Sequence, residues 1–338
     1  GINGWAIENR LYAEDPYRGF LPSIGRLTRY RPPAEMAAET SAVRNDTGVF
    51  EGGEISMYYD PMIAKLCTWA PSRAAAIEVM RDALDGFELE GIGHNLPFLS
   101  AVMDHPKFVS GDMTTAFIAE EFPDGFNGVD PADDVLMRLA AVAGHMKLKL
   151  DARETAISGA VEHHGREAGQ DWVVFLGKAR FDVHLDETDF GTEAVFAKGG
   201  MLRVTSDWTP GDRLFVGEVD GTSIIVKTDP VRGGLRLRYR GADMKAEVMS
   251  TRHAELKALM PEKVAADTSK LLLCPMPGLI VKVDVAEGDE VQDGQALCTV
   301  EAMKMENILR AERKGMIKKI NAKAGDSMGV DDVIMEFE

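Results

Sequence analysis

The sequence Val300-Glu301-Ala302-Met303-Lys304-Met305-Glu306-Asn307 joins two copies of one half-domain. Three landmarks repeat at one constant interval, without a gap: Gly278 and Gly315, Gly288-Asp289 and Gly325-Asp326, and the apolar runs beginning at Ala296 and Val333. Repeated units of this kind bury one shared core. Alternating apolar residues with Gly-Asp turns between them predict short strands. Residues 271–338 are therefore expected to form a flattened β-barrel with internal pseudo-two-fold symmetry.

The connection between the copies places Met303-Lys304 at the tip of a predicted hairpin. Two-residue hairpins favour Asn-Gly or Gly-Gly, because their turns need positive φ angles. Neither Met nor Lys adopts such angles readily. A sequence that departs from a local rule at one point often does so for function. An ordinary surface lysine is the simpler alternative, but the duplicated frame and the Met-Lys-Met tip favour a functional Lys304.

The motif Ala302-Met303-Lys304-Met305 and the upstream turn Pro275-Met276-Pro277-Gly278 resemble the biotin carboxyl carrier domain of biotin-dependent carboxylases. The resemblance implies that a biotin protein ligase attaches biotin covalently to Lys304, between Met303 and Met305. A lipoyl domain has the same barrel but an Asp-Lys-Ala tip, so the two methionines argue against it. Some carrier domains insert a loop ahead of the lysine, and the gapless repeat leaves no room for that loop.

Composition limits the classes of function for this chain of 338 residues, which is 45% hydrophobic and long enough for two or three domains. A net charge of −17 argues against nucleic-acid and anionic-membrane partners. No apolar run approaches the roughly 20 residues of a membrane-spanning helix, and no signal peptide is recognised. We expect a location in the bacterial cytoplasm or the mitochondrial matrix.

The cysteines and histidines predict neither disulfides nor a metal site. Cys67, Cys274 and Cys298 are scattered and odd in number, which is typical of buried thiols in a reducing compartment. None has a partner at the spacing of metal ligands. The pair His163-His164 precedes Gly165 and is interpreted as part of a polar loop.

Residues 1–125 carry a second resemblance. The strings Ala13-Glu14-Asp15-Pro16 and Tyr59-Asp60-Pro61-Met62-Ile63-Ala64-Lys65 resemble the closing subdomain of biotin carboxylase, an ATP-grasp enzyme. The resemblance implies that Arg10 is the active-site arginine that holds bicarbonate and the biotin enolate. A guanidinium suits this role, because it stays protonated and offers a planar fork to an anion. From the residues alone, an ion pair between Arg10 and Glu8 or Glu14 on a sheet surface is the alternative.

The ATP-handling parts of that enzyme have no counterpart in the sequence. We find neither the phosphate-binding glycine-rich loop nor the metal-binding carboxylates, and no Gly-Lys-Ser/Thr string. The chain starts within a predicted strand and without an initiator Met. We therefore expect it to be the C-terminal part of a longer polypeptide, whose preceding part binds ATP and Mg²⁺ or Mn²⁺. The chain alone is expected to be inactive as a carboxylase.

Residues 126–253 predict a long helix followed by strands. The helix is expected from Asp130-Pro131 to about Arg153, and seven or eight short antiparallel strands follow it. Strands at this spacing favour a barrel or sandwich, and the helix is apolar enough to be wrapped by it. The segments 204–212 and 240–243 resemble the domain that couples biotin carboxylase to its partner in carboxylases acting on propionyl-CoA. No catalytic constellation is apparent, so this domain is expected to hold partners together.

The predicted fold class is α+β and multidomain. Residues 1–125 are expected to be the mixed α/β end of a biotin carboxylase, 126–253 the antiparallel barrel around a helix, and 271–338 the biotinyl domain. Residues 254–270, which contain Pro261 and a polar run, predict a linker. A flexible tether would let the carrier visit two sites and would raise the local concentration of biotin at each.

Together, the resemblances imply the α subunit of a biotin-dependent acyl-CoA carboxylase. Such an enzyme carboxylates biotin on Lys304 with ATP and bicarbonate, and transfers the carboxyl group to an acyl-CoA on a separate carboxyltransferase β subunit. A large α/β hetero-oligomer is implied. Propionyl-CoA is the expected acceptor, and methylcrotonyl-CoA or another acyl-CoA is the alternative. A non-catalytic biotin carrier and scaffold is the rival from a different class.

Overall fold

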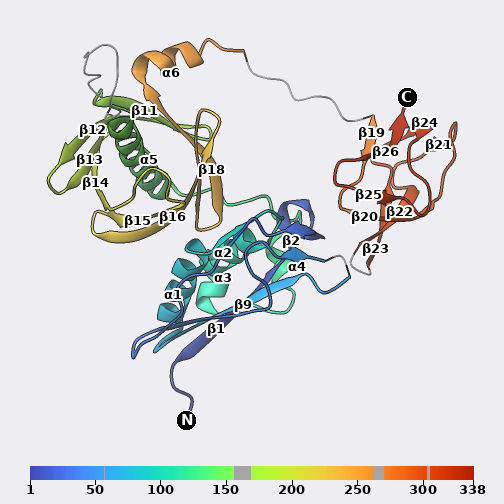
Figure 1. Cartoon of the computed structure of the whole chain (residues 1–338), viewed down its shortest axis with the longest axis horizontal. Coiled ribbons are helices and arrows are strands. Elements are labelled where there is room, and N and C mark those ends of the chain that lie inside the picture. Colours follow the sequence, from blue (N-terminus) through green and yellow to red (C-terminus); the bar gives the residue numbers. More distant parts are fainter. Residues whose placement is uncertain (57, 156–168, 262–269, 303–304) are drawn as a thin grey trace.

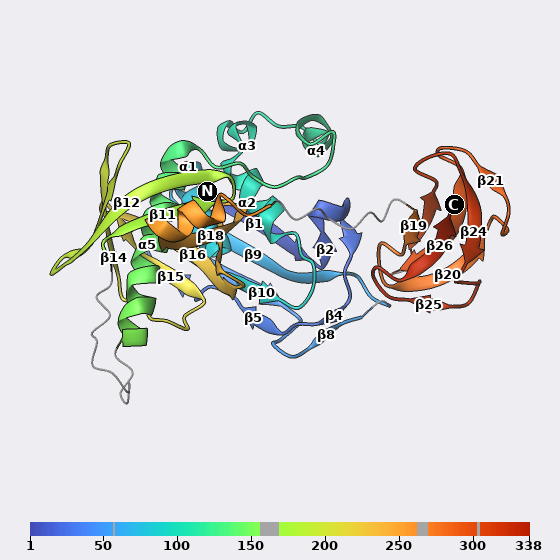
Figure 2. The same cartoon turned by 90° about the horizontal axis from the view of Figure 1, so that it is seen from above.

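The computed structural model describes residues 1–56, 58–155, 169–261, 270–302 and 305–338. They build an N-terminal unit (residues 5–121), a central barrel (133–250) and a C-terminal unit (271–337) (Figure 1). Seen from above, the barrel lies beside the N-terminal unit (Figure 2). Within the described ranges, no helix is long and apolar enough to cross a membrane.

The main sheet of the N-terminal unit has four antiparallel strands in the order β1-β9-β7-β6. These strands are β1 (Trp5–Tyr12), β9 (Met62–Ala70), β7 (Ala42–Thr47) and β6 (Met36–Ala37). Three two-stranded pairs flank it: β2 (Glu14–Asp15) with β3 (Leu21–Pro22), β4 (Gly25–Arg26) with β8 (Glu54–Ile55), and β5 (Arg29–Arg31) with β10 (Glu88–Glu90). The helices are η1 (Pro16–Arg18), α1 (Arg73–Asp85), α2 (Leu96–Asp104), α3 (Pro106–Ser110) and α4 (Phe117–Glu121).

Helix α1 packs against the inner face of this sheet, on β9 and β1. It begins at Arg73 because the Ser72 side chain accepts a hydrogen bond from the Ala75 N–H. Its buried residues recur at helical spacing and include Met80 and Leu84, both fully buried. Leu11 of β1 is also fully buried beneath it. The outer face of the sheet carries both polar and apolar side chains, among them Arg10, Lys65 and Trp69.

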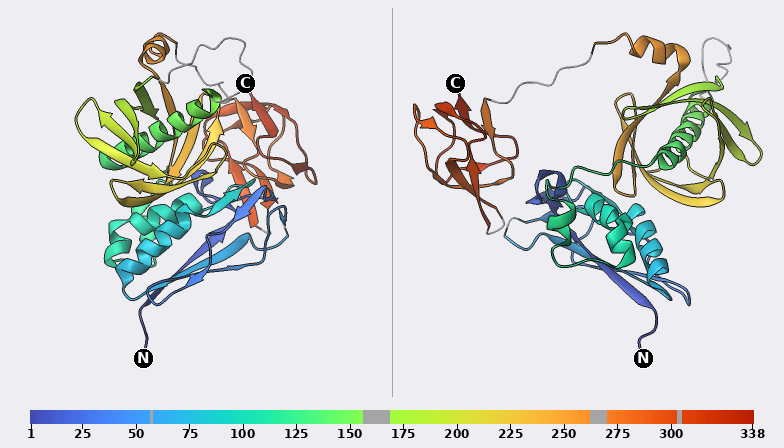
Figure 3. Two further views of the ribbon diagram at one scale, coloured as in Figure 1. Left: turned by 60° about the vertical axis from the view of Figure 1, so that its left-hand side comes forward. Right: turned by 180° about the vertical axis from the view of Figure 1, so that it is seen from behind.

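The central barrel is closed, and its eight antiparallel strands pair in chain order. They are β11 (Asp171–Leu176), β12 (Ala179–Thr188), β13 (Gly191–Phe196), β14 (Met201–Ser206), β15 (Leu214–Val219), β16 (Thr222–Val231), β17 (Gly234–Tyr239) and β18 (Ala242–Ser250). Helix α5 (Asp133–Thr155) runs inside the barrel (Figure 3). Residues 139–146 of α5 are buried without interruption, because strands surround the helix on every side. The predicted helix within a barrel is confirmed.

The C-terminal unit contains two four-stranded sheets, ordered β19-β26-β24-β21 and β23-β22-β20-β25. Its strands are β19 (Leu271–Leu273), β20 (Gly278–Val283), β21 (Glu290–Val291), β22 (Ala296–Ala302), β23 (Met305–Arg310), β24 (Gly315–Ile320), β25 (Ser327–Met328) and β26 (Val333–Phe337). Equivalent strands of the two sequence copies, such as β20 and β24, lie in different sheets. Ile280, Leu297, Ile317 and Ile334 from both copies meet in one core. The predicted pseudo-symmetric β-barrel is confirmed.

The start of the predicted linker needs correction. Helix α6 (Thr251–Lys257) extends through its first four residues and packs against β11 and β18. The Ser250 side chain caps this helix through the His253 N–H, and Ala254 is buried at 1% exposure. In the sequence, Ser250 is compatible with a helix cap, whereas Pro261 and the polar run favour a linker. Residues 262–269 of the predicted linker lie outside the described residues.

Candidate functional site

The predicted attachment hairpin is formed by β22 and β23. The two strands pair antiparallel, and the last pair of the ladder is Ala302 with Met305. Lys304 and Met303 follow Ala302 in the sequence and lie outside the described residues, as does the side chain of Met305. Ala302 is 1% exposed, so the base of the hairpin is anchored in the core.

The upstream turn predicted from the carrier motif packs against this hairpin. A Cβ atom on Gly278 would lie 2.6 Å from the Glu301 carbonyl oxygen, so β20 approaches β22 closely at this point. Asn307 of β23 donates from Nδ2 to the Met276 sulfur at 3.5 Å. The Cys274 thiol donates to the Met276 carbonyl at 3.0 Å. The turn therefore supports both strands that lead to residues 303 and 304.

The two sequence copies provide a matched test of this close approach. Gly278→Ala is expected to destabilise the C-terminal unit by about 1–3 kcal/mol, because the added methyl group meets backbone that must move. At the equivalent Gly315, a Cβ atom would make only an ordinary contact of 3.4 Å with Phe337. Gly315→Ala should therefore change the midpoint of thermal unfolding much less. Equal shifts of the unfolding midpoint for the two variants would contradict the closer approach of the backbone at Gly278.

Arg10 lies on the outer face of β1, with 56% of its side chain exposed. Its Nε atom donates to Glu8 Oε1 at 2.9 Å, which is the ion pair that sequence reasoning gave as the structural alternative. The hydrogen bond with Glu8, followed by that with Tyr12, raises the pKa of Arg10 above its already high usual value. The guanidinium is thus permanently charged and held along the strand.

The face around Arg10 carries further charge. The register pairs Arg10 with Lys65 of β9, and Lys65 with Asp46 of β7. Arg44 lies two residues before Asp46 and forms an ion pair with it at 2.9 Å. These side chains share the outer face with Arg10, because alternate residues of a strand point to the same side. Such a face can hold a small anion, with Arg10 as its forked donor.

Arg10 and the hairpin lie in different units. One ion pair that links these units joins Arg18 Nη2 to Asp331 Oδ1 at 3.9 Å, and both side chains are substantially exposed. Exposed pairs of this kind contribute little energy. A contact of this strength is compatible with a carrier unit that moves between sites.

A second polar assembly, which sequence reasoning missed, joins the barrel to the N-terminal unit. The β17–β18 turn consists of Arg240 and Gly241, both with positive φ (50° and 81°). The Arg240 N–H donates to Asp85 Oδ1 at 3.0 Å, and its Nε lies 3.1 Å from Asp85 Oδ2. Its Nη2 donates to Asp82 at 2.8 Å. The β17–β18 turn of the barrel therefore binds the last turn of α1 through hydrogen bonds and ion pairs.

Lys227 of β16 binds the same helix end. Its Nζ donates to the Leu84 carbonyl at 2.7 Å, where a cation also complements the helix dipole. Burial lowers the pKa of Lys227 to about 8. Burial also raises the pKa of Asp85 to about 6, although the positive charges of Arg240 and Lys227 act to lower it. Both groups line a cavity of about 30 Å³ with His94, whose buried Nδ1 has no hydrogen-bond partner among the described residues. Burial also lowers the pKa of His94, to about 3. A cavity of this size can hold about one water molecule.

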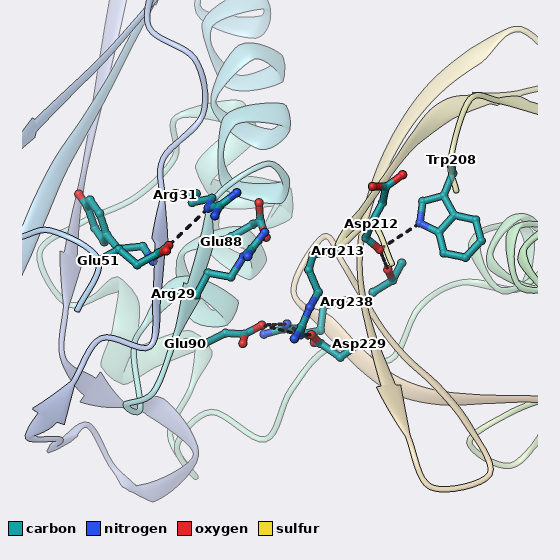
Figure 4. A network of polar contacts seen from close by, with 12 residues as sticks. Arg29, Arg31, Glu51, Glu88, Glu90, Trp208, Asp212, Arg213, Asp229 and Arg238 are labelled. Atoms are coloured by element: carbon teal, nitrogen blue, oxygen red, sulfur yellow. Dashed lines mark hydrogen bonds and ion pairs between the residues drawn. The ribbon is translucent and has the colours of Figure 1, made fainter. Parts of the chain in front are cut away.

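Four charges complete the junction (Figure 4). Arg213 and Arg238 of the barrel both form ion pairs with Asp229. Both also lie 3.5 Å from Glu90 of β10 in the N-terminal unit. The carboxylate of Glu90 thus meets two arginines that Asp229 already holds in place. Shared partners of this kind favour one fixed orientation of the barrel on the N-terminal unit.

The described residues contain no group of three or more potential metal ligands. The predicted polar loop with His163 and His164 lies outside the described residues.

Models of three known families match successive parts of the chain. The biotin carboxylase C-terminal domain matches residues 8–120, the propionyl-coenzyme A carboxylase BT domain matches 139–263, and the biotin-requiring enzyme family matches 270–337. Together with the barrel around α5 and the pseudo-symmetric C-terminal unit, these matches show that the chain belongs to the biotin-dependent carboxylases.

Within that class, the chain resembles the propionyl-CoA carboxylase alpha chains over its full length. It is 64% identical to that of Ruegeria pomeroyi, covering 100% of this chain and 52% of the relative. It is 38% identical to the mitochondrial propionyl-CoA carboxylase alpha chain of Mus musculus, covering 100% of this chain and 47% of the relative. The mitochondrial methylcrotonoyl-CoA carboxylase subunit alpha of Oryza sativa is 29% identical, over 97% of this chain and 48% of the relative. The chain thus spans about half the length of these relatives.

Proposed function

We propose that the chain is the biotin-carrying part of a propionyl-CoA carboxylase α subunit, with biotin attached through the amine of Lys304. The single observation that carries the proposal is the 64% identity to a propionyl-CoA carboxylase alpha chain across the whole chain. The pairing of Ala302 with Met305 at the ends of β22 and β23 supports it, because these residues flank Met303-Lys304 in the sequence. Attached biotin supplies a ring nitrogen that accepts and releases a carboxyl group. The task of the C-terminal unit is to present that group to two active sites.

Arg10 is proposed to hold bicarbonate and the anionic form of biotin at the first of these sites. Its exposure and its charged outer face support the role. The hydrogen bond to Glu8 through Nε fixes the guanidinium along β1. ATP with Mg²⁺ or Mn²⁺ would bind in parts of the relatives that this chain does not cover. Met303 and Met305 are proposed to flank the attached biotin.

We assign the roles by the predicted division of the chain, 1–125, 126–253, 254–270 and 271–338, except that residues 254–257 belong to α6 and pack with the barrel. The barrel is proposed to couple the biotin carboxylase to a separate carboxyltransferase β subunit, within an α/β hetero-oligomer that binds the acyl-CoA on the β subunit. A biotin protein ligase is the expected modifying partner. The bacterial and mitochondrial origins of the relatives support a cytoplasmic or matrix location.

A substrate-preference assay tests this function. The complete α subunit, assembled with its β subunit, is expected to carboxylate propionyl-CoA with a kcat/KM about tenfold or more above that for methylcrotonyl-CoA. The lower identity to the methylcrotonoyl-CoA carboxylase subunit supports this order. The reverse preference would establish the alternative substrate. An assembled, biotinylated complex that carboxylates no acyl-CoA would favour a carrier and scaffold instead.

A further inference from the structure

Asn95 stands where a helix cap is expected, but its side chain does not cap the helix. It directly precedes α2, and asparagine at this position usually accepts a hydrogen bond from the second or third N–H of the helix. From the sequence, Asn95 is expected to cap a helix that runs through Met103. In the structure its backbone has φ −84° and ψ 6°, and no side-chain cap bond forms. Pro97 near the helix start has no N–H and reduces the need for one.

The Asn95 carboxamide instead binds the backbone of β1 beside Arg10. Its Nδ2 donates to the Arg10 carbonyl at 3.1 Å, and its Oδ1 accepts from the Tyr12 N–H at 2.9 Å. The Asn95 backbone N–H also donates to the Tyr12 carbonyl at 3.2 Å. The residue is 6% exposed, so these bonds form largely away from water.

The location of these bonds matters because β1 is an edge strand. In the described part of the chain, the sheet order β1-β9-β7-β6 leaves one side of β1 without a neighbouring strand. In a strand, the carbonyl of residue i and the N–H of residue i+2 point to the same edge. A single residue of a neighbouring parallel strand could bind both of these groups. The carboxamide of Asn95 fills that place. It binds the peptide groups on both sides of Leu11.

The same point carries an irregularity in the sheet. Leu11 pairs with Ala64 but Tyr12 pairs with Met62, so the register shifts by one residue of β9 immediately after Arg10 and Leu11. Bulges re-aim the side chains near them and are frequent beside active sites. A strand that has a free edge and a shifted register needs a further contact to hold one geometry. Asn95 supplies this contact.

We propose that Asn95 is a positioning residue for Arg10, which it acts on through the backbone of β1. The inference rests on the proposed role of Arg10 in anion binding. Asn95 touches neither the anion nor the guanidinium. It sets the direction in which the Arg10 side chain leaves the strand, by fixing the peptide groups that follow Arg10. The register of the edge strand and the aim of the guanidinium are thereby coupled to the start of α2.

The test uses the complete α subunit in its assembled enzyme, with Asn95→Ala as the principal variant. We expect the KM for bicarbonate to rise and kcat/KM to fall about tenfold to 100-fold, since small misplacements of a positioning group cost rate on this scale. Amide hydrogen exchange at Tyr12 should accelerate, because its acceptor is gone. Asn95→Asp keeps the acceptor for Tyr12 but loses the donor to Arg10, so its effect on KM should be intermediate.

Asn45→Ala is the matched control. Asn45 is a buried asparagine of the same sheet, on β7, and its Nδ2 donates to the Tyr30 hydroxyl at 3.1 Å. Its loss should lower stability without raising the KM for bicarbonate. Equal increases in KM for the Asn45 and Asn95 variants would reduce Asn95 to a structural role. Unchanged Tyr12 exchange in Asn95→Ala, or faster exchange without a change in KM or kcat, would also overturn the proposal.

A separate variant distinguishes failure of this inference from failure of the proposed function. Arg10→Ala should abolish most biotin carboxylation. If that variant keeps full activity, the role of Arg10 is wrong and the positioning inference falls with it. If Arg10→Ala is inactive but Asn95→Ala behaves like Asn45→Ala, only the positioning inference is refuted.

Discussion

Replacing Lys304 with arginine is expected to abolish acyl-CoA carboxylation by the assembled enzyme, to below about 1% of the original rate. Arginine keeps the positive charge, but its guanidinium stays protonated at every accessible pH and cannot act as an amine nucleophile toward activated biotin. Without an attached carrier, the two active sites lose the high effective concentration that a tether provides. The measurement is propionyl-CoA-dependent carboxylation in the presence of ATP and bicarbonate.

Lys314→Arg is the control for this variant. Lys314 belongs to the same unit, is 64% exposed and pairs with Glu290 at 2.6 Å. Its replacement keeps the charge and should leave both biotinylation and activity unchanged. Substantial activity in Lys304→Arg, with biotin on another residue, would show that the attachment site is misassigned.

Replacing Arg240 with glutamine is expected to loosen the junction between the barrel and the N-terminal unit by about 3 kcal/mol. The change leaves the carboxylate of Asp85, which is 2% exposed, without its arginine partner. Breaking a buried pair by removing one partner is costly because the remaining charge is uncompensated. Glutamine preserves most of the length of the side chain and so limits the change to the charge. The measurement is denaturant unfolding of the complete chain.

The pH dependence of this effect identifies its cause. Burial raises the folded pKa of Asp85 above its usual value to about 6, so stability falls as the pH rises from about 4 to about 6. The charges of Arg240 and Lys227 lower the pKa of Asp85 and so limit this fall, whereas the charge of Asp82 raises that pKa. The destabilisation by Arg240→Gln should therefore be larger at pH 8, where Asp85 is ionised, than at pH 5, where it is mostly protonated. Equal destabilisation at both values would mean that packing, and not charge, dominates.

Arg180→Gln provides the matched comparison for Arg240→Gln. Arg180 pairs with Asp182 at 2.7 Å, but both side chains are nearly half exposed. Exposed pairs contribute about 0–1 kcal/mol, so this variant should remain close to the unmodified chain. If Arg180→Gln and Arg240→Gln lose equal stability, burial of the ion pair between Arg240 and Asp85 does not cause the destabilisation in Arg240→Gln.

The C-terminal unit was largely predictable from sequence because its information is local and repeated. The constant interval between Gly278 and Gly315 defined two copies, and alternation around Ile280 and Ile317 assigned their inward faces. The helix within the barrel was also predictable, since Leu139, Val142 and Met146 form an apolar stripe at helical spacing within α5. The sequence pattern does not predict strand β15. Its first three residues, Leu214 to Val216, are consecutively apolar, and Gly217 weakens the strand pattern.

The junction between the units could not be predicted from sequence. Asp85 and Arg240 are far apart in the chain, and each belongs to a segment that is plausible on its own as a helix end or a hairpin turn. Their pairing depends on how two folded units meet, and no local pattern encodes that. The one available signal was the turn at Arg240-Gly241, where an arginine occupies a position that usually favours asparagine or aspartate before glycine. The role of Asn95 could not be predicted for the same reason. Its local sequence predicts a helix cap, whereas its side chain binds the backbone of β1, which is distant in the chain.

The attachment of biotin to Lys304 is tested most directly by the intact mass of the chain after co-expression with a biotin protein ligase, followed by peptide mapping. We predict a gain of one biotinyl group, located on the peptide that contains Lys304, and no gain in Lys304→Arg. An unmodified chain in the presence of active ligase, or a lipoyl group on Lys304, would contradict the assignment of Lys304 as the biotin attachment site.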